Sequence, residues 1–232
     1  MNRGMLTAAV LAAGVALPAV ARAQVERLAG RVDAPTRAAI VAIVDSARGA
    51  GVPAEPLVNK ALEGASKGAD GARIVVAVRA LAADLAGARA ALGHGAGGAE
   101  LVAGAAALRA GVAPAFLARL RAAYPREPLV MPLAVMADLV ARGVPADTAA
   151  ESVIALMQEG VRDAYLVAFR QSVERDIALG APAGGAADAR ASGFAANLGI
   201  PGRSGPPGTG PTADGGAATP GGGQNPQPPR KP

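Results

Sequence analysis

Apolar residues recur along most of this chain at the spacing of an α-helix. The longest stretch is 72–92, where the apolar positions follow one another in steps of three and four residues. Such steps place them in one stripe along a helix, which suits close antiparallel packing. Asp70 precedes the stretch as a helix N-cap, and Gly93 follows it as a stop. The members of this stripe are Ile74, Val78, Leu81, Leu85, Ala88 and Leu92.

Shorter apolar stripes of the same kind precede and follow this stretch. Each ends at a glycine, and Asp33 with Pro35 just behind it marks the start of the first. No stretch shows the sustained two-residue alternation of a half-buried strand. We therefore predict an all-α body over residues 24–198, with alanines that let the helices pack closely. The further stripes are Ile40, Val44 and Ala47; Leu101, Ala105 and Leu108; Leu129, Leu133, Met136 and Val140; and Leu166, Phe169, Val173 and Ile177.

A short phrase recurs in the body. The sequence from Gly51 to Glu55, Gly-Val-Pro-Ala-Glu, returns from Gly143 to Asp147 as Gly-Val-Pro-Ala-Asp, and more loosely at Gly111-Val-Ala-Pro. It is typical of a helix that stops at a glycine, a turn, and a new helix with a carboxylate in its first turn. We predict antiparallel helical hairpins near 34–92, 99–142 and 143–180. They form either a solenoid-like stack or an irregular helical bundle in which the phrase is only a common helix boundary.

The first 23 residues are typical of a signal peptide. Arg3 precedes an apolar run, and Ala21 and Ala23 are small residues at the positions that signal peptidase reads, so the mature chain is expected to begin at Gln24. The alternative is an uncleaved membrane anchor, but the run is shorter than the roughly 20 residues that span a bilayer core. The chain has no cysteine, which excludes a lipoprotein anchor and disulfides. We predict an exported protein, periplasmic or secreted, with membrane contact only through an uncleaved leader.

The last residues, 199–232, have a different composition from the body. They hold ten glycines and nine prolines, and leucine, valine, phenylalanine and methionine are absent. Such a segment buries too little apolar surface to offset the entropy lost on ordering. We predict a disordered C-terminal tail.

The net charge of +5 does not indicate nucleic-acid binding. Without the leader the chain has 21 basic and 18 acidic residues, and without the tail the body has 18 and 17. No cluster of Lys and Arg follows the pattern of a phosphate backbone, and aromatic residues that stack on bases are few. We predict a body that does not bind nucleic acid.

Candidate catalytic chemistry is sparse. The single histidine, His94, lies in a glycine-rich stretch that predicts a solvated linker, and without cysteine the ordinary zinc sites are excluded. No P-loop is present. The carboxylates near helix ends fit capping, and Lys60 and Lys67 fit a solvated face. We therefore predict no catalytic, cofactor-binding or metal-binding residues, no cofactor, and a protein that is not an enzyme.

The favoured functional hypothesis is a non-catalytic, exported helical-repeat protein that binds a protein or a cell-envelope component. The alternative is a periplasmic carrier of a small molecule or lipid, with an apolar cavity between its helices. An enzyme that uses carboxylates alone is a third hypothesis, the least favoured. The oligomeric state is left open.

Overall fold

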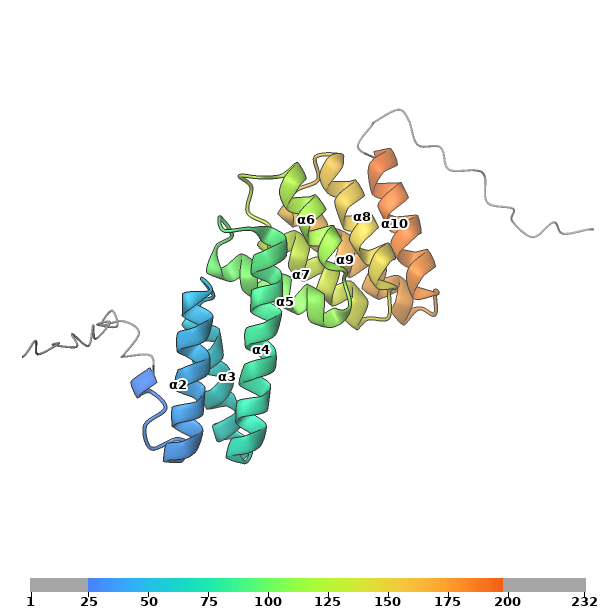
Figure 1. Ribbon diagram of the computed structural model, residues 1–232. Coiled ribbons are helices and arrows are strands. Elements are labelled where there is room, and N and C mark those ends of the chain that lie inside the picture. The colour runs from blue at the N-terminus through green and yellow to red at the C-terminus, as the bar shows by residue number, and fades with distance from the viewer. Residues whose placement is uncertain (1–24, 198–232) are drawn as a thin grey trace, which may run out of the picture. The chain divides into compact units, whose positions relative to one another are not determined.

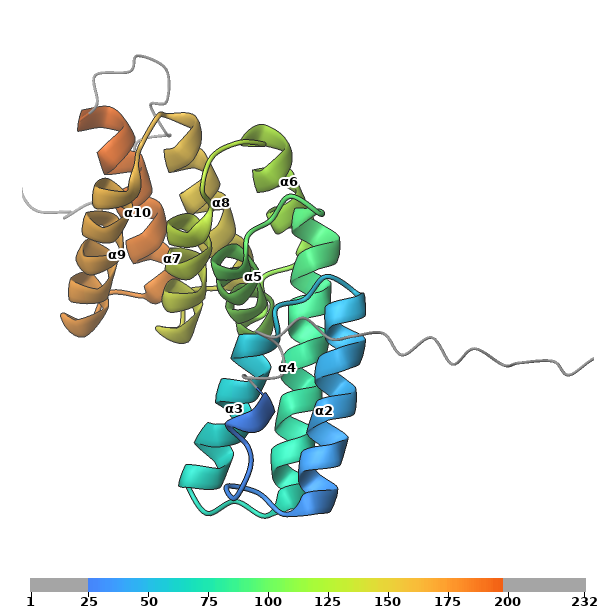
Figure 2. The ribbon, with the colours of Figure 1, turned by 90° about the vertical axis from the view of Figure 1, so that its left-hand side faces the viewer.

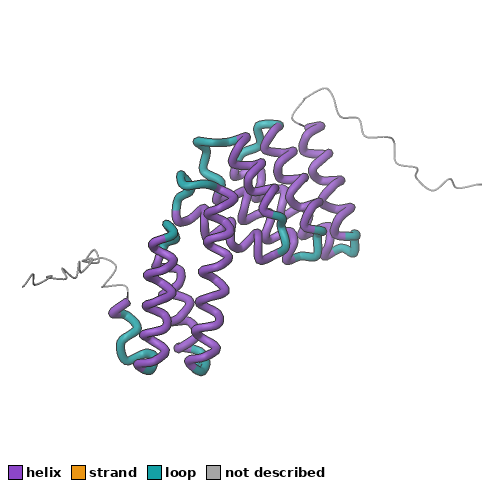
Figure 3. Tube along the Cα trace, viewed as in Figure 1, coloured by secondary structure: helices purple, strands orange, loops and turns teal. Residues whose placement is uncertain are grey.

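The computed structural model describes residues 25–197, and these residues form nine α-helices and no strand (Figures 1 and 3). The predicted all-α class is confirmed. The leader 1–23, with Ala21, Ala23 and the next residue Gln24, and the tail 199–232 lie outside the described residues. The helices are α2 (Ala34–Gly49), α3 (Ala54–Ser66), α4 (Gly71–Leu92), α5 (Gly98–Ala110), α6 (Pro114–Ala123), α7 (Val130–Ala141), α8 (Ala146–Gln158), α9 (Asp163–Ala178) and α10 (Ala183–Asn197).

Six of the glycine turns between helices share one hydrogen-bond pattern, and the turn at Gly93 differs. After α2, the Gly51 N–H donates to the Arg48 carbonyl and the Val52 N–H to the Ala47 carbonyl, both at 2.9 Å. Gly51 has φ +74°, which a residue with a side chain rarely adopts. This is the Schellman motif, and it ends the helix by satisfying its last carbonyls. The same pair of bonds follows Gly68, Gly111, Gly143, Gly160 and Gly180.

Extensive packing in residues 25–197 joins helices one or two places apart along the chain (Figures 1 and 2). Helices α2, α3 and α4 pack on one another, and α4 also contacts α5 and α6. Further on, α7 packs on α5, α8 and α9, while α10 packs on α8 and α9. Contacts between near neighbours are the pattern of stacked hairpins.

The core largely follows the predicted stripes, but Leu81, Leu108, Val140 and Ile177 are only partly buried, and α7 buries further residues. Ile40, Val44, Val78 and Phe169 have no exposed surface, as their stripes predict. In α7, however, the buried set also includes Val135 and Leu139. Because α7 packs on three other helices, it buries more than the one stripe that its spacing indicates.

The two copies of the Gly-Val-Pro phrase precede helices of equal length. Helix α3 covers residues 54–66 and α8 covers 146–158, so both ends are shifted by 92 positions, as is the start of the next helix, from Gly71 to Asp163. The packing is repeated only in part: α2 packs on α3 and α4 as α7 packs on α8 and α9, but α3 also packs on α4 whereas α8 packs on α10.

Helix α10 follows the last predicted stripe, and it packs on α8 and α9 through the buried Ala186 and Ala187 and through two longer side chains. Arg190 donates two hydrogen bonds to Asp176 of α9, at 2.6 and 2.7 Å, and these bonds hold the pKa of Asp176 below its usual value. The Phe194 ring packs edge-on against the buried Phe169 ring, with 6.1 Å between centroids. These contacts explain a helix whose own sequence has three glycines and little apolar periodicity.

Candidate binding groove

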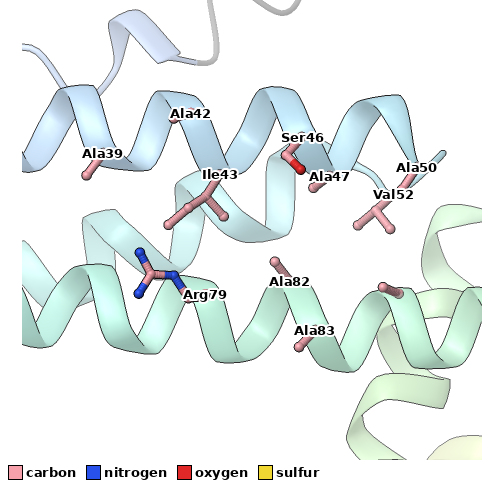
Figure 4. A pocket seen from close by; sticks show the side chains of 11 residues that line it. Ala39, Ala42, Ile43, Ser46, Ala47, Ala50, Val52, Arg79, Ala82 and Ala83 are labelled. Carbon is pink, nitrogen blue, oxygen red and sulfur yellow. The ribbon is translucent and has the colours of Figure 1, made fainter.

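An apolar groove of about 530 Å³ lies between α2 and α4 and is open to solvent (Figure 4). We call it the α2–α4 groove. Its walls are formed mainly by alanines, and Arg79 is the charged residue among those that line it. Ligand sites are commonly apolar concavities with a few polar groups, so this groove is a candidate binding site. The lining residues are Ala39, Ala42, Ile43, Ser46, Ala47, Ala50, Val52, Arg79, Ala82, Ala83 and Ala86.

The first wall, α2, begins at a well-formed cap. The Asp33 carboxylate accepts hydrogen bonds from the Thr36 N–H at 2.7 Å and from the Thr36 hydroxyl at 3.0 Å. The backbone bond is the larger cause and the hydroxyl the next, and together they hold the pKa of Asp33 below its usual value. The cap therefore stabilises the first turn of α2 while the carboxylate is ionised.

The second wall, α4, begins directly against this cap. Asp70 caps α4 by accepting the Arg73 N–H at 2.9 Å. A Cβ atom on Gly71 would overlap the Thr36 hydroxyl and lie 3.1 Å from an Asp33 carboxylate oxygen. The absence of a side chain at Gly71 thus lets the N-terminal ends of the two helices meet.

At the other end, Arg89 of α4 packs on the turn after α2. A Cβ atom on Gly51 would lie 2.7 Å from Arg89 Nη2, so the guanidinium lies against this glycine. Arg89 Nη1 also donates to the Ala96 carbonyl at 3.2 Å, in the loop before α5. Buried Ala47 and Val52 form the adjoining floor.

The charged side chain of Arg79 distinguishes the groove from an entirely apolar surface. Its side chain points from α4 toward α2 and lies beside Ile43 (Figure 4). Among residues 25–197, no carboxylate pairs with Arg79, and its guanidinium donates no hydrogen bond to a side chain or carbonyl. Nearby on α4, Val76 is 63% exposed. The surface therefore offers an unpaired cation within an apolar setting.

The corresponding surface between α7 and α9 is crossed by charges. Arg170 of α9 reaches Asp138 of α7 at 2.8 Å, and Arg142 at the end of α7 reaches Glu174 of α9 at 3.3 Å. We call this surface the α7–α9 seam. At the shift of 92 positions, its residues Asp138, Arg142 and Glu174 correspond to Ser46, Ala50 and Ala82, which line the groove.

A buried ion pair joins the middle helices and was missed by the sequence analysis. Glu100 is 8% exposed, and its carboxylate accepts the N–H groups of Gly97 at 3.1 Å and Leu129 at 2.9 Å while Arg121 Nη2 lies 2.7 Å away. Burial by itself would raise the pKa of Glu100, but the Leu129 N–H, Arg121 and the Gly97 N–H outweigh it, and the net pKa is lowered.

This pair organises the loop after α6. Arg121 Nη1 donates to the carbonyls of Tyr124, Pro125 and Glu127, at 3.2 to 3.3 Å. The loop prolines lack backbone donors, so the side chain of Arg121 supplies hydrogen bonds that the backbone does not. The available sequence signal was a carboxylate three residues after Gly97, as in a capping box.

A second groove of about 750 Å³ lies between residues 27–31 and α3, and it is more polar. Its polar groups are largely engaged with one another. Arg27 donates to Asn59 at 3.1 Å, and Lys60 and Lys67 both bind Glu63 and lower its pKa to about 2. The groove between α2 and α4 is therefore the stronger candidate site.

The remaining candidate residues lie where capping and pairing predict. His94 is exposed in the loop between α4 and α5. Glu151 pairs with Arg119 at 2.6 Å, and Asp163 begins α9. Within residues 25–197, no three His, Cys, Asp or Glu side chains lie together as metal ligands. In the same part of the chain, no helix has both the length and the apolar character to cross a membrane.

No protein-family model matches the chain, and the comparisons with curated proteins and with solved structures give no match.

Proposed function

We propose that this protein is an exported, non-catalytic helical-repeat protein that binds a protein or cell-envelope partner, and that the α2–α4 groove is its binding site. The groove carries the proposal because its alanine walls and exposed Val76 leave apolar surface uncovered beside the unpaired Arg79. An apolar patch with a polar group beside it is typical of an interaction site.

The α7–α9 seam supports this choice. That seam has the same kind of helix pair but is crossed by ion pairs, as expected for a surface that faces water. The groove has serine and alanine at the corresponding positions. Exchange of those charges for small side chains favours contact with another molecule over contact with solvent.

Crosslinking from within the groove tests the proposal. A photoreactive amino acid at the exposed Ala83 is expected to give one discrete adduct in the producing cells, and the same group at the exposed Ala164 of α9 none. The triple variant Ser46→Asp, Ala50→Arg, Ala82→Glu copies the charges of the α7–α9 seam into the groove, and should abolish the adduct without unfolding the protein. Equal adducts at both positions would contradict the proposal.

The proposed export of the protein is tested separately. We propose that residues 1–23 are removed on export, because Ala21 and Ala23 fit the subsites of signal peptidase. The protein recovered from periplasmic or culture fractions should begin at Gln24. Recovery from the cytosol with Met1 intact would contradict export. The tail, 199–232, is proposed as a spacer, so truncation after Leu198 should leave the crosslink unchanged.

The alternative function is that of a carrier of a small molecule or lipid, and the volume of the groove supports this alternative. About 530 Å³ lies within the range of small-molecule sites, roughly 300–1,000 Å³. Native mass spectrometry of the protein purified from its own cells is expected to give the bare chain mass. A bound small molecule, lost in the triple variant, would favour the carrier instead.

A further inference from the structure

We infer that the α2–α4 groove takes an apolar α-helix of a partner protein, rich in small residues and with one carboxylate directed at Arg79. The inference rests on the proposed function and names the chemistry of the partner. Its two grounds are the shape of the walls and the charge between them.

The walls fit a helix. Helices α2 and α4 run parallel on either side of the groove (Figure 4), and both present alanines to it. Small side chains let the axis of a third helix come close, so that its ridges pack between the two walls. The lining of α2 runs from Ala39 to Ala50, which is about 17 Å of helix at 1.5 Å per residue, or about three turns.

The positive charge of Arg79 favours a carboxylate on the partner helix. Arg79 lies in the groove with no ion pair among residues 25–197, and an arginine beside apolar surface is stabilised by a carboxylate that accepts two of its N–H groups. Within the groove lining there is no acidic residue. An apolar helix without a carboxylate would bury the guanidinium unpaired, which costs free energy.

A second copy of the chain fits this charge less well. The acidic residue of α2 beside the groove, Asp45, already lies 3.8 Å from Arg48 of its own helix. Asp84 of α4 pairs with Arg109 of α5. A two-fold related copy therefore brings no unengaged carboxylate from either wall to Arg79.

The test uses synthetic helical peptides of about 18 residues, built from Ala, Leu and Gly, with one central Glu, Gln or Lys. Binding to the purified protein is measured by fluorescence anisotropy. The Glu peptide should bind about tenfold more tightly than the Gln peptide, the size of one charge-assisted pair. Arg79→Gln should remove this preference, and Arg79→Glu should transfer it to the Lys peptide.

Arg73→Gln is the matched control, because Arg73 lies on the same helix outside the groove with its side chain 82% exposed. It should leave the Glu preference unchanged. Circular dichroism of each variant excludes unfolding as the cause. Equal affinity of the Glu and Gln peptides, or no binding of either, would overturn the inference.

Two further outcomes would overturn it in favour of another occupant. Laurate binding that depends on Arg79, with no binding of the Glu peptide, would assign the groove to an acyl chain. A dimer in sedimentation that the triple variant dissociates would assign it to a second copy. If the peptides fail while the Ala83 crosslink to a protein persists, the inference fails and the proposed function stands.

Discussion

The α2–α4 groove and the α7–α9 seam are formed by helix pairs at corresponding places in the chain, yet their surfaces differ. The seam has Asp138, Arg142 and Glu174, while the groove has Ser46, Ala50 and Ala82. Both helix pairs keep a buried core, with Val44 in α2 and Met136 in α7 fully covered. The difference teaches that corresponding helix pairs can keep the same buried stripe while their outer positions hold either ion pairs or small side chains.

The largest expected effect concerns the junction between these two regions. Glu100→Gln should lower the free energy of unfolding by about 3 kcal/mol, because it leaves the charge of Arg121 buried without its ion pair. Chemical denaturation measures the loss. Hydrogen exchange should show faster exchange in α6 and α7 and little change in α2 and α4.

Arg109→Gln is the control for this variant. It removes an ion pair with Asp84 in which the arginine is half exposed, and should cost less than about 1 kcal/mol. If both variants lose the same stability, the loop after α6 does not depend on the buried pair.

The next prediction compares the stability losses caused by corresponding substitutions in the two helix pairs. Gly71→Ala should destabilise the protein by about 2 kcal/mol, since the new Cβ overlaps the Thr36 hydroxyl and pushes α4 from α2. The corresponding variant in the second pair, Asp163→Ala, should cost only about 0.5 kcal/mol, the size of one helix-dipole interaction. Thermal unfolding compares the two.

A double variant sharpens this prediction. Thr36→Ala removes the overlapping hydroxyl, so adding it to Gly71→Ala should recover part of the lost stability. Strictly additive losses would show that the close approach of α4 to α2 is not the cause.

A smaller effect is expected when the seam is given the side chains of the groove. The variant Asp138→Ser, Arg142→Ala, Glu174→Ala should cost about 1 kcal/mol in total, because the ion pairs are partly exposed and screened. The loss relative to the unchanged protein should shrink in high salt, measured by denaturation at two ionic strengths. A loss that salt does not change would assign these residues a packing role.

The smallest effect is a dependence of stability on acid pH that arises in α3, which packs on both helices of the first pair. Lys67 and Lys60 lower the pKa of Glu63 from 4.5 to about 2. The ionised carboxylate therefore contributes stability above pH 4.5, and the contribution is lost as the pH falls through about 2. Glu63→Gln should flatten the acid part of the stability curve. An unchanged curve would contradict the assignment.

Several local features were predictable because they depend on neighbours in the chain. The caps Asp33 and Asp70 act on backbone N–H groups three residues ahead. The stripe through Ile74 and Val78 needs only helical spacing to become a buried face. The stop at Gly93 likewise needs only a residue that tolerates a positive φ. The all-α class follows from these local rules.

The rest was decided by contacts between residues far apart in the chain. Helix α10 is fixed by the bonds between Arg190 and Asp176, by Phe194 packing on Phe169 and by its buried alanines, since its own sequence has three glycines and no clear apolar stripe. The burial of Glu100 depends on a loop 29 residues away. Arg79 is part of a groove because α2 packs beside α4, which the sequence around Arg79 does not reveal. Sequence periodicity specifies which face of a helix is apolar, but the packing of other helices decides which apolar faces are covered and which stay open.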